Sequence, residues 1–521
     1  MTGYLMVGVP LMLFALSAQA QMHRWTDANG VVHFSDRVPA NAGKQGYVDT
    51  RQLERDRTSQ RQSGVVLAGM DANSWQRLNT YLNSRHFYDV EQILSSARSR
   101  VASDISQEPV LADLYSVFDS GDPAMQSLFN DWVRLRSGSE YAYLARATYL
   151  VGLAQQAMQR SANDEAHNLM MAAMTDVDSA LRHSPDSSIG YSLLLRASHA
   201  TTTATQYDQY RQQAMQRLPQ SLLVASTAVD LAYQQGLASS GSAAGGEAKA
   251  RLLVRQALFH VSKNPLLVSL EGRLLFLQAA TAHQRGQQVR AMGQIKQALN
   301  IASSAEYLRL LGTLQLQQQH YQQALLAFDQ ALALRSADAA SLLGRAEVYA
   351  GLNQYRNAAA ELAAARRLAP DDTRVAQWSA QLIGSLASLA RQAAAGQNWQ
   401  AALDYLDKAL LINPYSGPAR FERASVWYQM GNYSEAEADA LVAVDARKAP
   451  IAWYQLLSDL YGKKQYWQRQ QDIWSQFLQR NGDNPDALLA RAEARRHNND
   501  VIGARADVSR AANISATAAG Q

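Results

Sequence analysis

The chain contains no cysteine among its 521 residues. This absence excludes a disulfide framework, a thiolate nucleophile, a cysteine-ligated zinc or iron–sulfur site and a lipidated N-terminal cysteine. Strong positive charge is also missing, because the net charge is only +4 although the pI is about 9.0. So small a net charge does not favour binding to the phosphate backbone of a nucleic acid. The composition therefore predicts no nucleic-acid partner.

Familiar catalytic motifs are missing as well. The sequence has no P-loop and no G-x-S-x-G, and its ten histidines form no H-E-x-x-H. Asp371 and Asp372 follow Pro370, which indicates a helix start rather than an acid/base pair. We therefore expect no enzyme activity and no catalytic, cofactor or metal site. One alternative stays open, a hydrolase whose residues from 75–235 meet only in the folded chain.

Long apolar runs are absent after residue 16. Leu5 to Leu16 are almost all apolar, which matches the core of a signal peptide and is too short for a membrane span. Ala18-Gln19-Ala20 forms a small-x-small cleavage site, although no Lys or Arg precedes the run. We expect residues 1–20 to be a cleaved signal peptide, leaving no stable membrane span. An uncleaved inner-membrane anchor is the alternative.

A short β-hairpin is predicted at residues 21–39. Two runs rich in β-forming residues flank Asn29-Gly30, and this pair favours the tight turn of a hairpin. Residues 40–68 are polar and rich in Arg, Gln and Ser, which is typical of a solvated linker.

The hairpin segment carries the pattern W-x-D-x-x-G-x-x-x-F-S-D. The residues that form it are His23, Trp25, Asp27, Gly30, Phe34, Ser35, Asp36 and Pro39. In these positions the segment resembles a bacterial domain family of unknown function that follows signal peptides in proteobacterial envelope proteins. The resemblance implies a periplasmic location and no particular activity.

Helical spacing dominates the rest of the chain. Apolar residues recur at helical intervals over 69–236, which predicts a helical, repeat-like region. The run ASSGSAAGG lies within 237–248, where we expect a flexible insert. Residues 249–304 carry weaker copies of the pattern described next, and we expect degenerate helical repeats there.

The residue pattern of one short helix recurs at least six times. Its opening position holds an aromatic residue or its replacement at steps of 34, 44, 34, 34 and 34: Tyr321, Tyr355, Trp399, Tyr433, Trp467 and Val501. Small residues recur three and ten positions later and a larger one seven positions later, as in Ala324, Phe328 and Ala331. These offsets fall on one helix face, so tiny and bulky side chains alternate where two helices would touch. Ten extra residues before Trp399 predict a longer helix around 377–395.

The 34-residue period resembles that of tetratricopeptide repeats, over residues 305–514. The resemblance implies an all-α, right-handed α-solenoid of helix hairpins, preceded by the β-hairpin module and the irregular helical region. Residues 515–521 are expected to be a disordered tail.

An array of this kind implies a binding scaffold, here a non-enzymatic periplasmic one for a protein or peptide of the cell envelope. In the family, particular positions of each first helix line the groove. The corresponding polar residues are Arg309, Glu347, Arg391, Tyr428, Gln429, Asp459, Lys463, Arg496 and His497. The alternative is an accessory protein of exopolysaccharide or cell-wall machinery that contacts glycan, since nine tryptophans permit sugar stacking. Trp132 and Trp474, however, have the spacing of core residues.

Overall fold

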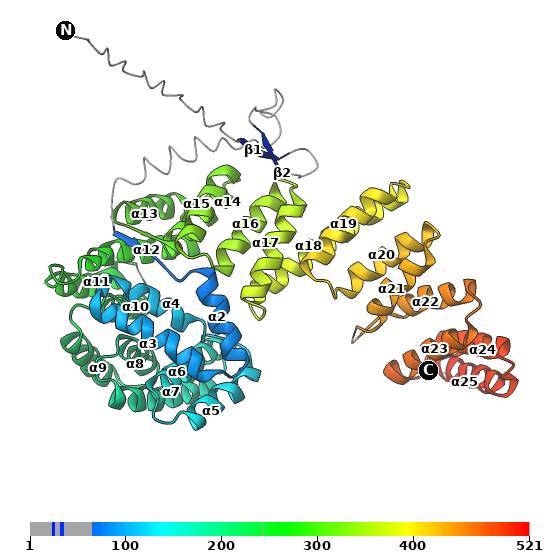
Figure 1. Ribbon diagram of the computed structural model, residues 1–521, viewed down its shortest axis with the longest axis horizontal. Helices are drawn as coiled ribbons and strands as arrows, with labels where there is room; N and C mark the ends of the chain where they lie inside the picture. Colours follow the sequence, from blue (N-terminus) through cyan, green and yellow to red (C-terminus); the bar gives the residue numbers. More distant parts are fainter. Residues whose placement is uncertain (1–22, 27–31, 36–64, 242, 447, 520–521) are drawn as a thin grey trace, which may run out of the picture. The chain divides into compact units, whose positions relative to one another are not determined.

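The computed structural model describes residues 23–26, 32–35, 65–241, 243–446 and 448–519 (Figure 1). The chain divides into two compact units, residues 1–62 and 63–521. In the first unit, β1 (His23–Thr26) pairs antiparallel with β2 (Val32–Ser35), so that Trp25 lies opposite His33. The predicted hairpin is thereby confirmed. The predicted signal peptide, the Asn-Gly turn and most of the predicted linker lie outside the described residues.

The second unit is built almost entirely of helices. They are α2 (Ala72–Asn83), α3 (Phe87–Ser103), α4 (Glu108–Ser116), α5 (Gln126–Leu135), α6 (Glu140–Gln159), α7 (Asn163–His183), α8 (Ser188–Thr201), α9 (Ala204–Arg217), α10 (Leu222–Ser240), α11 (Ala243–Leu258), α12 (Ser269–Gln284), α13 (Gln288–Ile301), α14 (Ala305–Gln317), α15 (Tyr321–Leu334), α16 (Ala339–Gly351), α17 (Tyr355–Leu368), α18 (Thr373–Ala395), α19 (Trp399–Ile412), α20 (Gly417–Gln429), α21 (Tyr433–Val444), α22 (Ile451–Lys463), α23 (Trp467–Asn481), α24 (Pro485–His497) and α25 (Val501–Ala519). Among the described residues, no helix is both long and apolar enough to cross a bilayer.

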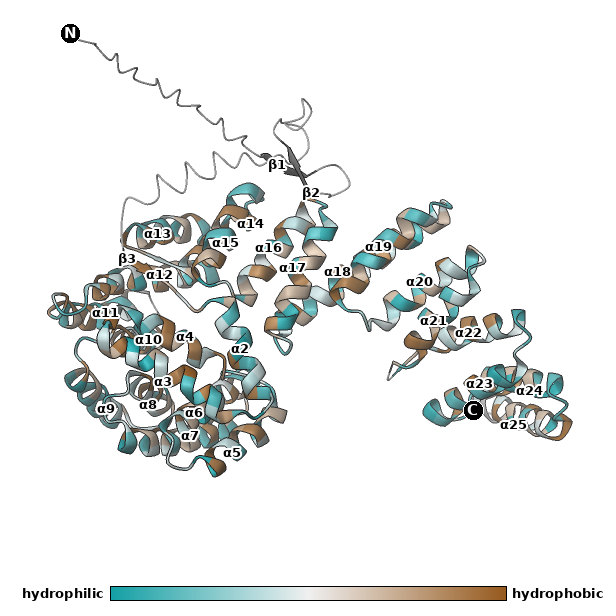
Figure 2. Ribbon diagram, viewed as in Figure 1, coloured by the Kyte–Doolittle hydropathy of each residue, from teal (hydrophilic) through white to brown (hydrophobic). Residues whose placement is uncertain are grey.

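Successive helices pair into hairpins, and the hairpins stack on one another. α14 packs on α15, α16 on α17, α18 on α19, α20 on α21 and α24 on α25, while the first helices of neighbouring hairpins also touch, as α14 and α16 do. No single hairpin can bury its apolar face alone, so stacking completes each core. The predicted solenoid of tetratricopeptide-type hairpins is confirmed. Figure 2 shows hydrophobic and hydrophilic residues alternating along these helices, as amphipathic packing requires.

The alternation of tiny and bulky residues works as the sequence predicts. Ala324 and Ala331 are fully buried, and Phe328 between them is only 1% exposed. A methyl group on Gly312 would lie 2.8 Å from the Phe328 ring, so the first helix can approach this ring only because it has glycine there. The long helix predicted before Trp399 is also present, since α18 has 23 residues.

The turn inside each hairpin has a feature that the sequence analysis missed. Two residues before each second helix, the backbone adopts a left-handed conformation with φ near 60° or above. The positions are Gln319, Asn353, Gln397, Gly431, Gln465 and Asn499. Only one of these is glycine, so repeated Gln and Asn carry a conformation that glycine would adopt more readily.

Three expected boundaries differ from the structure. Residues 237–248 do not form a flexible insert: α10 runs to Ser240 and α11 begins at Ala243. Gly246 is a packing residue, because a methyl group there would meet the Tyr233 carbonyl oxygen at 2.7 Å, whereas Gly241 ends α10 in a left-handed conformation. The tail expected at 515–521 is helical to Ala519. Within the predicted linker 40–68, β3 (Val65–Leu67) forms a parallel pair with β4 (Ala302–Ser304).

Candidate binding cavity

A cavity of about 880 Å³ lies among helices of the first half of the second unit. Residues from α4, α6, α7, α8, α10, α12 and α14 line it, together with residues 67–69 at the end of β3 and just after it. The lining is mixed, with hydroxyl, amide and charged groups beside leucines of α10 and α12. This volume lies within the range of ligand pockets, which runs from roughly 300 to 1,000 Å³.

An extended segment closes one side of this cavity. We call residues 65–72 the strap. Besides pairing with β4, the strap donates three backbone hydrogen bonds: Gly69 N–H to the Leu334 carbonyl at 2.9 Å, Met70 N–H to Asp113 Oδ2 at 2.9 Å, and Ala72 N–H to Ser336 Oγ at 2.7 Å. The strap thus joins α4 to the end of α15 although these elements are more than 200 residues apart in the sequence.

An ion pair reinforces the same junction. The Arg335 guanidinium contacts both carboxylate oxygens of Asp113, and its Nε lies 2.8 Å from Oδ2. Asp113 is buried, with a side chain that is 6% exposed, so its charge requires this partner. Burial also lowers the pKa of Arg335, and the nearby Asp338 opposes that shift. The ion pair thereby joins α4 to the end of α15.

A second charged cluster lies on α10, α12 and α14. Arg273 binds Asp230 through two hydrogen bonds of 2.9 and 2.7 Å and also contacts Glu306. Although burial disfavours the charged guanidinium, these two carboxylates raise the pKa of Arg273 well above its usual value. The attraction of Arg273 in turn lowers the pKa of Glu306, against the opposing effect of burial. Arg273 is therefore fully neutralised within the cavity wall.

Arg196 on α8 is different. It lines the cavity and, among the described residues, it forms no hydrogen bond or ion pair. Burial lowers the pKa of its guanidinium, while the charges of Asp119 and Asp230 act in the opposite direction from a distance. Arginine keeps its charge in proteins. Arg196 therefore presents a cation to the cavity without a direct counter-ion.

Neutral polar groups surround this cation along α8 and α10. Ser192 lies one helical turn before Arg196, and its hydroxyl is 2.8 Å from the Thr227 hydroxyl. His199 lies three residues after Arg196 and packs edge-on against Tyr207 at 5.1 Å. Burial lowers the pKa of His199, so the imidazole is neutral near pH 7. The wall offers donors and acceptors that suit the backbone of an extended ligand.

The carboxylates of this cavity bear on the hydrolase alternative, because the cavity does gather acidic residues and a histidine. Glu108 is fully buried, accepts hydrogen bonds from Ser221 Oγ at 2.5 Å and Leu223 N–H at 3.0 Å, and has a pKa raised by burial. Asp113, Asp230 and Glu306 are held by arginines. Among the described residues, His199 forms no hydrogen bond with a hydroxyl or carboxylate, and no His, Asp and Glu cluster has metal-site spacing. The acidic residues therefore serve the structure of the wall.

The predicted groove residues lie outside this cavity. They lie on the first helix of each hairpin, namely α14, α16, α18, α20, α22 and α24. Arg309 lies 2.8 Å from the Asp338 carboxylate, and Arg391 lies 2.6 Å from that of Glu422. The His497 ring stacks on Trp467 at 3.9 Å, and Tyr428 tilts against Tyr433 at 5.7 Å. The others range from half-buried to exposed: Glu347, Gln429, Asp459, Lys463 and Arg496. Whether they contact a partner stays a prediction.

The tryptophans bear on the glycan alternative. Trp132 and Trp474 are fully buried, as predicted. The remaining tryptophans from residue 65 onward are half-buried: Trp75, Trp378, Trp399, Trp427, Trp453 and Trp467. None of these eight presents a largely exposed ring, which is what stacking on a sugar requires.

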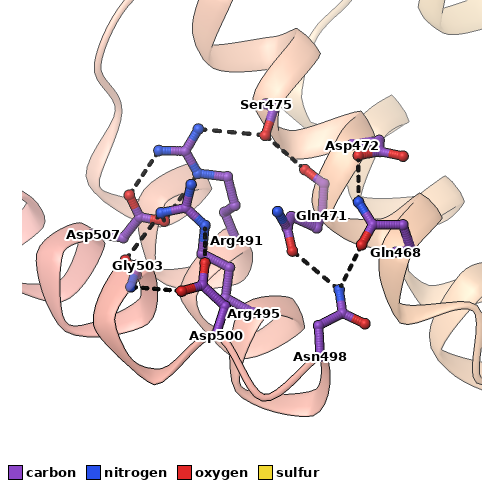
Figure 3. A network of polar contacts seen from close by, with 10 residues as sticks. All are labelled: Gln468, Gln471, Asp472, Ser475, Arg491, Arg495, Asn498, Asp500, Gly503 and Asp507. Carbon is purple, nitrogen blue, oxygen red and sulfur yellow. Dashed lines mark hydrogen bonds and ion pairs between the residues drawn. The ribbon is translucent and has the colours of Figure 1, made fainter.

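A repeated arginine clamp was also missed by the sequence analysis. Arg345 contacts Asp329 and Glu361, and Arg423 contacts Asp407 and Asp439, in each case 16 residues before and after. Arg491 has the same arrangement, with Ser475 before it and Asp507 after it (Figure 3). Each clamp ties a first helix to its own second helix and to the preceding one. The constant separation of 16 residues is a sequence signal that could have revealed it.

Comparison with known proteins gives two findings. Residues 11–62 match the family described as a domain of unknown function, DUF4124, over a segment that extends beyond the predicted hairpin on both sides. No curated protein matches the chain.

Several solved structures of tetratricopeptide repeat proteins are similar to the chain. One from Parabacteroides merdae is 21% identical, covers 46% of this chain and 92% of its own, and has a TM-score of 0.22. One from Thermus thermophilus, TTC0263, is 18% identical over 43% of this chain and 98% of its own, with a TM-score of 0.17. Yeast Tom70 is 13% identical over 85% of this chain and 91% of its own, with a TM-score of 0.25. These TM-scores are low, so the assignment of the fold rests on the chain's own hairpins.

The hairpins of the structure agree with the repeat pattern of the sequence. The aromatic residues that step by 34, and once by 44, open successive second helices, and the small residues that follow them are buried between helices. The helical part of the chain therefore has the fold of tetratricopeptide repeats, and residues 11–62 match a domain of unknown function.

Proposed function

We propose that the protein is a non-enzymatic scaffold in the bacterial periplasm that binds an extended segment of another envelope protein. The observation that carries this proposal is the cavity of about 880 Å³, lined by helices of successive hairpins. Stacked hairpins present such helices along a continuous surface, and that surface suits an extended peptide.

The cavity's chemistry favours a peptide over a glycan. Arg196 offers a charge that no direct counter-ion neutralises, and Ser192 and Thr227 offer hydroxyl groups beside it. An acidic side chain or a terminal carboxylate would give Arg196 the partner it lacks, because arginine binds carboxylates with paired hydrogen bonds. From residue 65 onward the described tryptophans are half-buried or fully buried, which removes the main support for sugar stacking.

Affinity capture with matched variants tests the binding role. The bait is the mature full-length chain from residue 21, because the strap and the Asp113–Arg335 pair hold residues 305–335 in place and a shorter array would lose both. We expect Arg196→Met to reduce recovery of the same periplasmic partner about tenfold, the loss of roughly 1.4 kcal/mol from one charge-assisted contact. Arg182→Met is the control, since Arg182 is 65% exposed and contacts Asp178 and Ser179 on its own helix. Equal recovery by both variants would contradict a site at this cavity.

The periplasmic location has a separate test. Fractionation of cells that express the full-length chain should place it in the periplasm, with its N-terminus at Gln21. Ala20→Arg should block cleavage and retain the chain at the inner membrane, because signal cleavage needs a small residue there. Recovery of the unmodified chain in the cytoplasm would refute the location without affecting the binding experiment.

A further inference from the structure

The strap occupies an unusual place in the chain. It begins within three residues of the boundary of the first unit, yet its contacts are with elements of the second unit that lie far along the sequence. Val65 pairs with Ala302 and Leu67 with Ser304, and Gly69 reaches the end of α15.

The strap is held by few groups. Val66 is 58% exposed and Ala68 is exposed, whereas Met70 is only 4% exposed and belongs to the core that includes α2 to α4. Apart from Met70, attachment depends on a short parallel ladder, three backbone hydrogen bonds and the half-buried side chains of Val65 and Leu67, which pack against core residues. Segments with few buried apolar contacts open locally at free energies well below that of global unfolding.

The strap also forms part of the cavity wall. Leu67, Ala68 and Gly69 all line the cavity, together with residues of α8 and α10. At Gly69 the fit is close: a methyl group there would collide with the Asp113 carboxylate and would lie 3.2 Å from Arg335 Cβ. Since Asp113 and Arg335 hold each other, neither can give way freely. Gly69 therefore allows the strap to seat against the ion pair.

We propose that the strap is a detachable lid that opens and closes the cavity. In the closed state the strap pairs with β4 and covers one side of the cavity. In the open state residues 65–70 leave β4 and Asp113, and an extended ligand enters beside Arg196. The ligand in this account rests on the proposed function, whereas the movement of the strap does not.

Hydrogen exchange measures the opening itself, in the full-length mature chain without any partner. We expect the amides of Val66 to Met70 to exchange through local opening at least about tenfold faster than the buried amides of α8 and α10. A disulfide between Val66→Cys and Ser303→Cys should slow the strap amides selectively. These two positions are directly paired across neighbouring strands, within bridging distance, and the chain has no other cysteine. Exchange of the strap only through global unfolding would overturn the proposal.

Thiol labelling measures access to the cavity. Ser226 lines the cavity on α10, so Ser226→Cys places a near-isosteric probe there. We expect a bulky maleimide to label this thiol about tenfold faster when Gly69→Ala is added, because the strap can no longer seat. Gly138→Ala is the matched control, since nothing lies within 4 Å of a methyl group at Gly138. The oxidised Val66→Cys/Ser303→Cys pair should slow labelling instead.

These experiments test the lid and the proposed binding function independently. If neither Gly69→Ala nor the disulfide changes the labelling rate, the strap does not cover the cavity and the lid is wrong, whatever partner the protein binds. Should Gly69→Ala prevent folding, the disulfide variant still decides the question, because it only adds a bond between residues that already pair. If the lid responds as expected while Arg196→Met leaves partner recovery unchanged, the lid stands and the proposed function fails.

Discussion

Two regions of the helical unit use the same hairpin in different ways. Helices α2 to α15 enclose a cavity and are joined end to end by Asp113 and Arg335, which are 222 residues apart in the chain. Helices α16 to α25 are joined mainly to their immediate neighbours, and their buried residues divide into several separate clusters. The first region has one large continuous core from α2 to α12, and smaller clusters lie in α12 to α15.

This difference predicts different cooperativity. In an array of nearest-neighbour contacts, stability is close to a sum of repeat and interface terms, and unfolding can begin at an end. A region closed by contacts between its first and last helices loses that freedom, because opening any hairpin strains the closure. We therefore expect α2 to α15 to unfold as a unit and α16 to α25 to unfold in steps.

The largest test of this comparison uses a tryptophan from each region. Trp132 and Trp474 are both fully buried, and each indole N–H donates a hydrogen bond, to Glu91 at 3.1 Å and to Ser458 at 2.9 Å. Replacing either with alanine should cost about 3–5 kcal/mol, because a large cavity remains. Hydrogen exchange should show Trp132→Ala loosening all of α2 to α15. Trp474→Ala should loosen only α21 to α25.

The control for this pair is the other half of the same molecule. Amides of α16 to α20 should keep their protection in Trp132→Ala, and amides of α6 to α10 should keep theirs in Trp474→Ala. If Trp474→Ala instead unfolds the chain in a single transition, the two regions do not differ in cooperativity.

A smaller loss of stability should follow from replacing Arg335, which closes the first region, or Arg423, which forms a repeated arginine clamp. Arg335→Met leaves the buried Asp113 carboxylate without its partner, and we expect a loss of about 3 kcal/mol in the free energy of unfolding. Arg423→Met should cost about 1–2 kcal/mol, because Arg420 still binds Asp439 at 2.6 Å. Urea denaturation followed by circular dichroism measures both. Equal losses would mean that closure adds nothing beyond an ordinary clamp.

The next contrast concerns pH. Burial raises the pKa of Glu108 above its usual value of 4.5, and it also raises the pKa of Glu347, which is half-buried and near Arg374. A raised pKa means that the folded state holds the proton more tightly than the unfolded state. The stabilisation is therefore complete below pH 4.5 and is lost as pH rises through the raised pKa.

Glu108→Gln should remove this dependence. We expect the wild-type chain to lose thermal stability relative to the variant as pH rises from about 4.5 to 8, with a smaller difference for Glu347→Gln. Melting temperatures at matched ionic strength provide the comparison. A wild-type chain that gains stability over Glu108→Gln in this interval would show that Glu108 is ionised and favourably bound.

The repeated part of the fold could be predicted because one residue pattern recurs in six units. Tyr321, Ala324 and Phe328 do the same work in each copy, so spacing alone reveals the contact face. The long helix α18 and the buried Trp474 followed from the same spacing.

The cavity and the strap could not be predicted in this way. They depend on Asp113, Arg335 and residues 302–304, which meet only after the first superhelical turn has closed. Val65–Leu67 has three apolar residues beside a polar stretch, too few for a pattern. Glycine misled the prediction at 237–248, because close helix packing and flexibility both call for glycine, and Gly236 and Gly246 serve packing.

The smallest change in stability should come from Arg391, and it decides which region binds the partner. Arg391 is 60% exposed and pairs with Glu422 at 2.6 Å, so Arg391→Met should alter the free energy of unfolding by less than about 0.5 kcal/mol. If the partner lies in the cavity, this variant should recover it as well as the wild-type chain does, whereas Arg196→Met should not. If recovery falls for Arg391→Met instead, the groove along α16 to α24 is the binding surface. Helices α16 to α25 would then bind the partner, and helices α2 to α15 would only support them.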